Sequence, residues 1–245
     1  MSRAFEITRE VDLPAAPDDV WTAITADTAA WMFPTGMEIP AGATPPEGAP
    51  VTTWDPPNRL VIRMESPDGT FNALDYSIEA RAGGTAHLRY VHSGILADEW
   101  EDQYDAIDGH TDFYLHTLAQ YLEHFNGRPA TYVGQPSSGI EGPAAAGTPD
   151  AMDTLRSALG VSPTDGVGDA VHASLGDAGT LDGVIDYSTP EFLGIRTEDG
   201  LFRFFGRNFF PGGVVGMSAH LFVEGGVDAA ASEAALKKWL DSVYA

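Results

Sequence analysis

The chain has 245 residues, which is enough for one large domain or two smaller ones. Its 36 acidic and 13 basic side chains give a formal net charge of −23, so the surface repels phosphate backbones and anionic lipid. We therefore expect neither a nucleic acid nor a membrane among its partners. Cysteine is absent, which excludes disulfides and thiolate chemistry. Residues 1–10 are too charged for a signal peptide, and no stretch approaches the roughly 20 apolar residues of a membrane span, so we expect a cytoplasmic protein.

The first elements are a strand and two short helices. Apolar residues alternate with polar ones over 5–13, apart from Arg9, which predicts a strand with one buried face. Two short helices are expected over 17–33, because Pro17 suits a first helical turn and the acids after it suit the positive end of the helix dipole. The segment 39–50, "IPAGATPPEGAP", has no periodicity and is expected to be a loop.

Four further strands follow, at about 50–55, 59–65, 70–80 and 85–92. Short turns join them, so the strands should be antiparallel neighbours. Alternation assigns one set of side chains to the covered, concave face of this sheet. That set comprises Leu60, Ile62, Met64, Asn72, Leu74, Tyr76, Ile78, Ala86, Leu88, Tyr90 and His92.

The segment 98–125 predicts one long amphipathic helix that ends near Gly127. Its apolar residues fall within a stripe roughly 100° wide. The stripe comprises Trp100, Tyr104, Ile107, Thr111, Tyr114, Leu118, Tyr121, Leu122 and Phe125. The acids on the other side are expected to form a solvated surface, and these are Asp98, Asp102, Asp105, Asp108, Asp112 and Glu123.

The second half begins with a segment that has the composition of a linker, 129–149, rich in Pro, Gly, Ser and Ala. A short helix is expected at about 150–159 and a final helix at about 228–243. The strands expected between them lie at about 168–175, 181–188, 192–197, 201–206 and 214–223.

Three short stretches occur twice in the same order. "PNRLVIRME" (57–65) is matched by "PEFLGIRTE" (190–198), "DGTF" (68–71) by "DGLF" (199–202), and "AHL" (86–88) by "AHL" (219–221). Each match falls on a predicted strand or turn, and a helix follows the last strand in both halves. We therefore predict an internal duplication, in which 150–245 is a shortened, degenerate copy of 1–128, with "ATYV" (130–133) as a candidate opening strand.

The first half resembles a known superfamily. "FEITREVDLPAAPDDVWTAIT", Trp31, "PPNRLVIRM" and the long helix after "RYVHSG" are similar to the START/Bet v 1-like (SRPBCC) superfamily, and most of all to its branch related to the activator of Hsp90 ATPase. This resemblance implies an α+β helix-grip fold, a curved antiparallel sheet wrapped on a long C-terminal helix. The superfamily includes ligand carriers, polyketide cyclases and aromatases, and co-chaperones. Gly109-His110 stands where members often carry Gly-Trp.

No motif for metal, cofactor or nucleophilic chemistry stands out. No two histidines have the i, i+4 spacing of a helical zinc pair, there is no Gly-x-Ser-x-Gly elbow, and no Walker lysine exists. We therefore expect no cofactor, no bound metal and no local catalytic motif.

A pocket remains the main hypothesis for a site. A long helix lying across a concave sheet leaves space unless large side chains fill it. The expected lining mixes polar and apolar groups: Met64, Asn72, Tyr76, Tyr90, His92, His110, Tyr114 and Leu118. The alternative is a filled core in which the polar groups bond to one another.

Three functions follow from these patterns. The first is a non-enzymatic protein that binds a small apolar or aromatic molecule between the helix and the sheet. The second is a protein-interaction module like the Hsp90 ATPase activator, with a protein partner, a filled cavity and an exposed apolar patch. The third is a cyclase-like enzyme, which would need His92 or His110 as a base and Tyr76 or Tyr114 as a donor. The aromatic segment "LFRFFGRNFFPGG" (201–213) is expected to pack against the first domain, with Phe113 as a contact, and the alternative is a binding surface or a second pocket.

Overall fold

A computed structural model describes residues 3–96, 100–209 and 212–245, with residue 96 and residues 100–106 described in their backbone only. The chain divides into two compact units, Met1–Arg128 and Pro129–Ala245. The division follows Arg128, the same place where the sequence ends the first domain. Among the helices of the described residues, none combines the length and the apolar composition that a membrane crossing needs.

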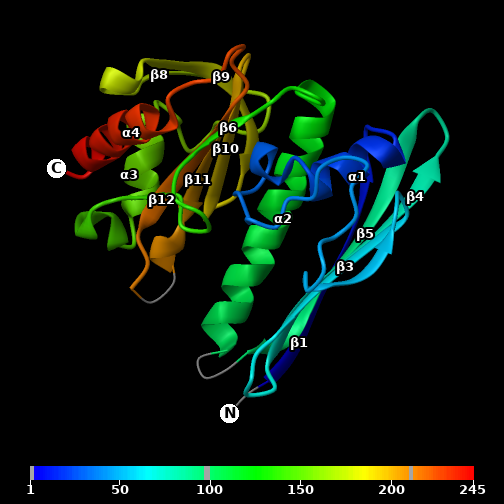
Figure 1. The fold of residues 1–245 in the computed structure, drawn as a ribbon. Coiled ribbons are helices and arrows are strands. Elements are labelled where there is room, and N and C mark those ends of the chain that lie inside the picture. Colours follow the sequence, from blue (N-terminus) through cyan, green and yellow to red (C-terminus); the bar gives the residue numbers. More distant parts are fainter. Residues whose placement is uncertain (1–2, 97–99, 210–211) are drawn as a thin grey trace. The chain divides into compact units, whose positions relative to one another are not determined.

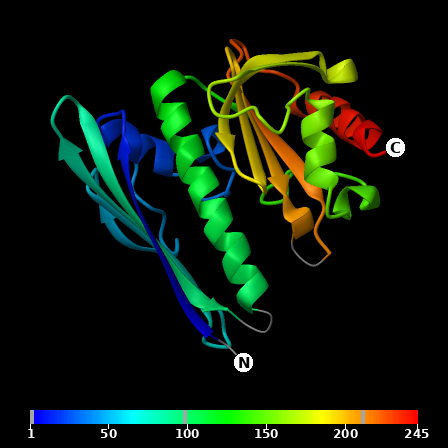
Figure 2. The ribbon, with the colours of Figure 1, turned by 180° about the vertical axis from the view of Figure 1, so that it is seen from behind.

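The first unit is an antiparallel sheet with one long helix along a face of it. Its sheet has the strand order β1-β5-β4-β3-β2. Figures 1 and 2 show α2 lying along one face of this sheet, the arrangement that defines a helix-grip fold. In chain order the elements are β1 (Arg3–Leu13), α1 (Pro17–Thr25), η1 (Thr28–Ala30), β2 (Val51–Asp55), β3 (Arg59–Glu65), β4 (Phe71–Arg81), β5 (Thr85–Leu96) and α2 (Trp100–His124).

The core of this unit lies on the predicted face of the sheet. Leu60, Ile78 and Leu88 are buried there, since strand alternation turns them to the same side. The predicted stripe of α2 is confirmed from Thr111 onward by the burial of Leu118 and Phe125. Trp100 and Tyr104 lie outside the described side chains. Further residues of α2 that are not in the stripe are also buried, namely Phe113, Leu115 and Thr117.

Arg9, the exception in the alternation of β1, connects that strand to α2. Its guanidinium donates hydrogen bonds to Asp112 at 2.5 and 3.1 Å and to Asp108 at 2.8 Å. The two aspartates were expected on a solvated face, and that expectation is wrong for them, because each is only partly exposed and paired with Arg9. The side chains of Asp98, Asp102 and Asp105 lie outside the described part of the chain.

The second unit also combines an antiparallel sheet with helices. The strand order is β6-β12-β11-β10-β9-β8, and β7 pairs with β12. Figures 1 and 2 show α3 and α4 on one face of this sheet. In chain order the elements are β6 (Thr131–Val133), β7 (Ile140–Glu141), η2 (Ala144–Gly147), α3 (Ala151–Ala158), β8 (Ala170–Ser174), η3 (Gly176–Ala178), β9 (Thr180–Ser188), β10 (Phe192–Thr197), β11 (Gly200–Gly206), η4 (Arg207–Phe209), β12 (Val215–Leu221) and α4 (Ala229–Val243).

The segment 129–149 is not a linker. It contains β6, already foreseen as a possible opening strand, and β7, and both pair with β12. Its glycines and prolines form the turns between these short strands, which include a bridge between Gln135 and Gly139. The composition of 129–149 indicated its turns. The pairing of its strands with β12, much later in the chain, places the segment in the second unit.

The two units share a strand order, and the second is a shortened helix-grip layout. In each, the first strand lies beside the last, and the preceding strands follow in reverse order. The final helix has 15 residues in α4 and 25 in α2. The first two sequence matches fall on the corresponding hairpins β3–β4 and β10–β11. The "AHL" match does not correspond, since Ala86 pairs with Ala80 at the start of β5 and Ala219 pairs with Phe202 at the end of β12.

The aromatic segment 201–213 is divided between the two faces of β11. Phe204 belongs to the core of the second unit, where its ring centroid lies 6.3 Å from that of Trp239. On the other face, the buried Arg203 donates to both carboxylate oxygens of Asp186, at 2.8 and 3.0 Å. Phe210 lies outside the described residues.

Candidate functional site

The first unit contains a cavity of about 260 Å³ on the concave side of β3 and β4. None of the described residues of α2 lines it. The lining consists of Ile24, Thr25, Thr28, Met32, Thr35, Gly36, Met37, Glu38, Ile39, Pro46, Ala49, Pro50, Val51, Leu60, Ile62, Leu74 and Tyr76. The sheet and α1, together with the segment 28–51, therefore enclose this space. This differs from the predicted position between the sheet and α2.

Backbone hydrogen bonds hold the covering segment in place. Ile39 N donates to Thr25 O at 2.9 Å, which attaches the segment to the end of α1. At its other end, Arg63 N donates to Pro50 O at 2.7 Å, which attaches it to β3. Gly36, Met37 and Pro46 line the cavity and are also exposed, so the cavity opens to the surface beside them.

Glu38 is the acidic side chain of this lining, and its carboxylate is firmly positioned. Oε1 accepts hydrogen bonds from Thr28 Oγ1 at 2.7 Å, Thr35 N at 2.7 Å and Thr35 Oγ1 at 3.1 Å. Burial alone would raise the pKa of the Glu38 carboxyl, but the hydrogen bonds from Thr28 and Thr35 outweigh burial. The pKa therefore lies below its ordinary value of 4.5, and the group is ionised at neutral pH.

Four of the eight predicted site residues gather on β4 and β5. Tyr76 and Tyr90 are opposite each other in the ladder, with ring centroids 5.0 Å apart. His92 Nε2 lies 2.6 Å from Asn72 Oδ1, so the ring donates to the amide oxygen. Burial lowers the pKa of His92 to about 4 and raises the pKa of both tyrosines. Of these four residues, Tyr76 alone belongs to the cavity lining.

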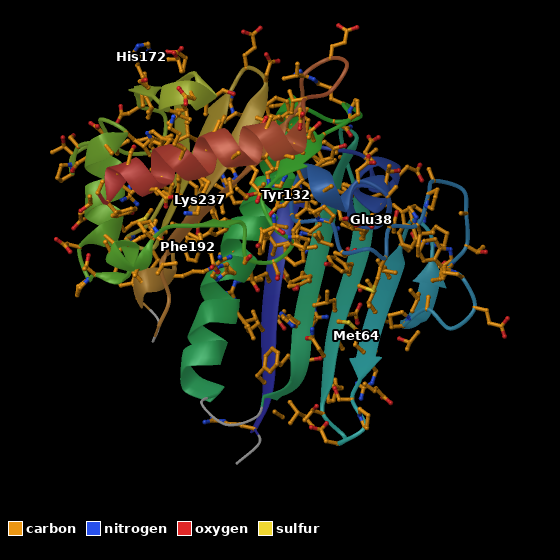
Figure 3. All side chains as sticks on the ribbon, turned by 60° about the vertical axis from the view of Figure 1, so that its left-hand side comes forward. Glu38, Met64, Tyr132, His172, Phe192 and Lys237 are labelled. Atoms are coloured by element: carbon orange, nitrogen blue, oxygen red, sulfur yellow. The ribbon has the colours of Figure 1, made fainter. Side chains whose placement is uncertain are left out.

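The other four predicted residues are divided between β3 and α2, and none of them lines the cavity described above. His110 and Tyr114 lie on α2 with ring centroids 6.2 Å apart, and Leu118 is fully buried. Met64 pairs with Asn72 between β3 and β4. Figure 3 shows Met64 well along the sheet from Glu38.

Comparisons with solved structures find similar folds. The protein MLL2253 from Mesorhizobium loti is 17% identical, with a TM-score of 0.40, over 49% of this chain and 98% of that one. The Aha1 dimer from Colwellia psychrerythraea is 18% identical, with a TM-score of 0.38, over 50% of this chain and 99% of that one. DynU16, from the dynemicin biosynthetic locus, is 15% identical, with a TM-score of 0.38, over 98% of this chain and 95% of that one. No family model and no curated protein matches the sequence.

These identities and TM-scores are low, so the fold assignment depends on the topology itself. The strand order β1-β5-β4-β3-β2, with α1 and η1 after the first strand and α2 after the last, decides it. The first unit has the helix-grip fold of the START/Bet v 1-like superfamily. The concave face of the sheet, which the resemblance implied, forms one wall of the cavity.

The residues that cover the helix-grip cavity were not predicted from the sequence. Leu60, Ile62 and Leu74 were predicted on the concave face, and they do line the cavity. Glu38 and the two threonines that donate to it were not predicted, because the segment around them has no periodicity. The available signal was one acid between apolar neighbours, "GMEIP" (36–40), just before a loop rich in proline.

The helix-grip cavity has few groups for acid–base chemistry or metal binding. The part of its lining that the structure describes contains two ionisable side chains, Glu38 and Tyr76. The pKa of Glu38 is lowered and that of Tyr76 is raised, so both move away from neutral pH. Within the described residues, no three His, Asp or Glu side chains gather as metal ligands would. The described lining therefore combines a mostly apolar surface with one fixed negative charge.

Proposed function

We propose that this chain is a binding protein that holds a small apolar or aromatic molecule in the cavity of its first unit. The observation that carries this proposal is the cavity of about 260 Å³, with a largely aliphatic lining that opens at Gly36, Met37 and Pro46. Such a space can remove most of the apolar surface of a small ligand from water. This burial supplies roughly 25 cal/mol for each Å² covered.

The titratable groups favour binding over catalysis. A general base works best when its pKa lies near the operating pH. His92, proposed above as a base, has a pKa of about 4 because it is buried, and its Nε2 already donates to Asn72. Glu38 and Tyr76 in the cavity are shifted away from neutrality as well. Among these groups, none has the pKa of an efficient base at pH 7.

The protein-interaction alternative has less support. It requires a filled cavity and an exposed apolar patch of several hundred Å². The described residues include four large apolar side chains that are exposed, and they come from separate segments: Met37, Val167, Phe209 and Val223. Met37 already belongs to the opening of the cavity.

A thermal-shift screen with small aromatic and aliphatic compounds tests the proposal. A ligand that binds the folded state raises the melting temperature by mass action. Ala49 belongs to the covering segment 28–51 and lines the cavity. Ala49→Trp should therefore fill the space and abolish the shift in melting temperature. Ala43→Trp, at an exposed position of the same loop, should leave the shift intact. If no compound shifts the wild type, or if Ala49→Trp responds like Ala43→Trp, the cavity is not the binding site.

A further inference from the structure

The charge of the cavity restricts which small molecules can occupy it. Among the described residues that line the cavity, Glu38 is the single charged one, and none of them is Lys, Arg or His. An anionic ligand would therefore bring its charge towards a carboxylate without a cation to offset it. A ligand with a positive charge would find the opposite charge at short range, beside a largely apolar surface.

The threonine hydroxyls of the lining already donate to acceptors within the protein. The Thr28 and Thr35 hydroxyls both donate to Glu38 Oε1. The Thr25 hydroxyl donates to the carbonyl oxygen of Trp21 at 2.7 Å. The hydrogen bonds from Thr28 and Thr35 to the Glu38 carboxylate all end on Oε1, so a ligand can donate to Oε2.

The volume sets the size of such a ligand. At about 30 Å³ for each water-sized group, a cavity of about 260 Å³ holds roughly nine non-hydrogen atoms. The aliphatic part of the lining, including Ile24, Ile62 and Leu74, would cover the body of the molecule. Glu38 would then face its polar end.

We propose that the ligand is a small protonated amine with an apolar body, an inference that rests on the function proposed above. Glu38 Oε2 accepts a hydrogen bond from the ammonium group of this amine. The same charge weakens the binding of fatty acids and other carboxylates of the same size. Neutral alcohols are accepted more weakly, since they offer a donor without a charge.

Calorimetric titration of the full chain with three molecules of one skeleton tests this inference. Octylamine, octan-1-ol and octanoate differ only in the polar group and match the size of the cavity. At neutral pH and physiological ionic strength, we expect octylamine to bind about tenfold more tightly than octan-1-ol, the effect of one charge-assisted hydrogen bond. Octanoate should bind more weakly than either.

Variants separate Glu38 from the general negative charge of the chain. Glu38→Gln keeps an oxygen that can accept from Thr28 and Thr35, and it should reduce octylamine affinity about tenfold and octan-1-ol affinity by a smaller factor. Glu47→Gln removes an exposed charge of the same loop and should change neither affinity. Octylamine binding that survives in Ala49→Trp would be surface adsorption and would overturn the inference.

The possible failures are distinguishable. The inference is wrong, while the proposed function stands, if octan-1-ol binds and octylamine binds no more tightly. The same holds if Glu38→Gln binds octylamine with the affinity of the wild type. If none of the three molecules binds the wild type, both are wrong.

Discussion

Arg9 on β1 and Asp112 on α2 form a two-point ion pair, with Nε to Oδ1 at 2.5 Å and Nη2 to Oδ2 at 3.1 Å. Asp108, one helical turn earlier, accepts from the same guanidinium. These bonds fix the rotation of α2 about its axis, because they turn two of its acids towards the first strand. They also explain why one arginine stands in the alternation of β1.

Asp112→Asn should therefore weaken the first unit. The variant keeps the size of the side chain and removes the charge that Arg9 contacts. We expect a loss of about 0.5 to 1 kcal/mol in the free energy of unfolding, since the pair is partly exposed to solvent. Urea denaturation should show a smaller loss at high salt. Glu123→Gln, on an exposed part of the same helix, should have little effect, and an equal loss in both variants would contradict the role given to Arg9.

Gly194 explains one difference between the repeated stretches "PNRLVIRME" and "PEFLGIRTE". A β-carbon at Gly194 would collide with the Asp186 carboxylate and the Arg203 guanidinium. Val61 holds the matching position in the first stretch. Glycine is thus needed where the buried ion pair lies over β10.

Gly194→Ala should destabilise the second unit by about 2 kcal/mol or more, because the methyl group would displace a buried charge from its partner. Thermal denaturation followed by Trp239 fluorescence measures this loss. Gly166→Ala is the matched control, because a β-carbon there meets open space. A melting temperature that Gly194→Ala leaves unchanged would mean that the ion pair is not packed on this strand as described.

His92 should make the stability of the first unit depend on pH. The folded state keeps His92 neutral down to about pH 4, whereas the unfolded chain takes up the proton near pH 6.5. Between these values the unfolded state binds more protons, so the free energy of unfolding falls as the pH falls. We expect His92 to account for roughly 3 kcal/mol of the loss between pH 7 and pH 4.

The contribution of His92 is measured as the difference in the free energy of unfolding between wild type and His92→Gln from pH 7 to pH 4. Glutamine can still donate to Asn72 but does not titrate. His172→Gln, at an exposed position of the second unit, is the control and should follow the wild-type curve. Parallel curves for wild type and His92→Gln would show that His92 titrates normally in the fold.

Thr28→Val should loosen the Glu38 carboxylate. The valine has the same shape as threonine but removes one of the three donors to Oε1. We expect the pKa of Glu38 to rise towards its ordinary value and the unit to lose about 1 kcal/mol of stability. Carbon-detected NMR titration of the Glu38 carboxyl measures the first effect, and Thr44→Val, on the exposed part of the loop, is the control. An unchanged titration in Thr28→Val would mean that the Thr28 hydroxyl does not hold the carboxylate.

Sequence periodicity predicted most of the fold. The strands β3 and β10 have the bounds that alternation and turn residues indicate, and α2 follows from its apolar stripe. The pairing of β6 and β7 with β12 was not predicted as a whole, because strands of two or three residues carry little pattern of their own. The shared strand order agrees with an internal duplication, yet the "AHL" match falls at different ends of its strands. Common descent of the two units therefore stays a prediction.

The candidate site was predicted on its regular side only. Leu60 and Tyr76 are placed by strand alternation, so the sequence could assign them to the concave face. Glu38 is placed by backbone and side-chain hydrogen bonds of an irregular segment, and such bonds leave no periodic trace. The sequence analysis assigned no partner to Arg9. It therefore did not predict the ion pairs that set the rotation of α2 about its axis.

Methyl NMR of the full chain during titration with octan-1-ol tests the central claim most directly. The isoleucine signals of Ile24, Ile39 and Ile62 report from the cavity lining, and those of Ile185 and Ile195 report from the core of the second unit. We predict saturable shifts at the three lining methyl groups and none at the other two. Shifts confined to the second unit, or no saturable shift at the lining, would contradict a ligand-binding cavity beneath α1 and its covering loop.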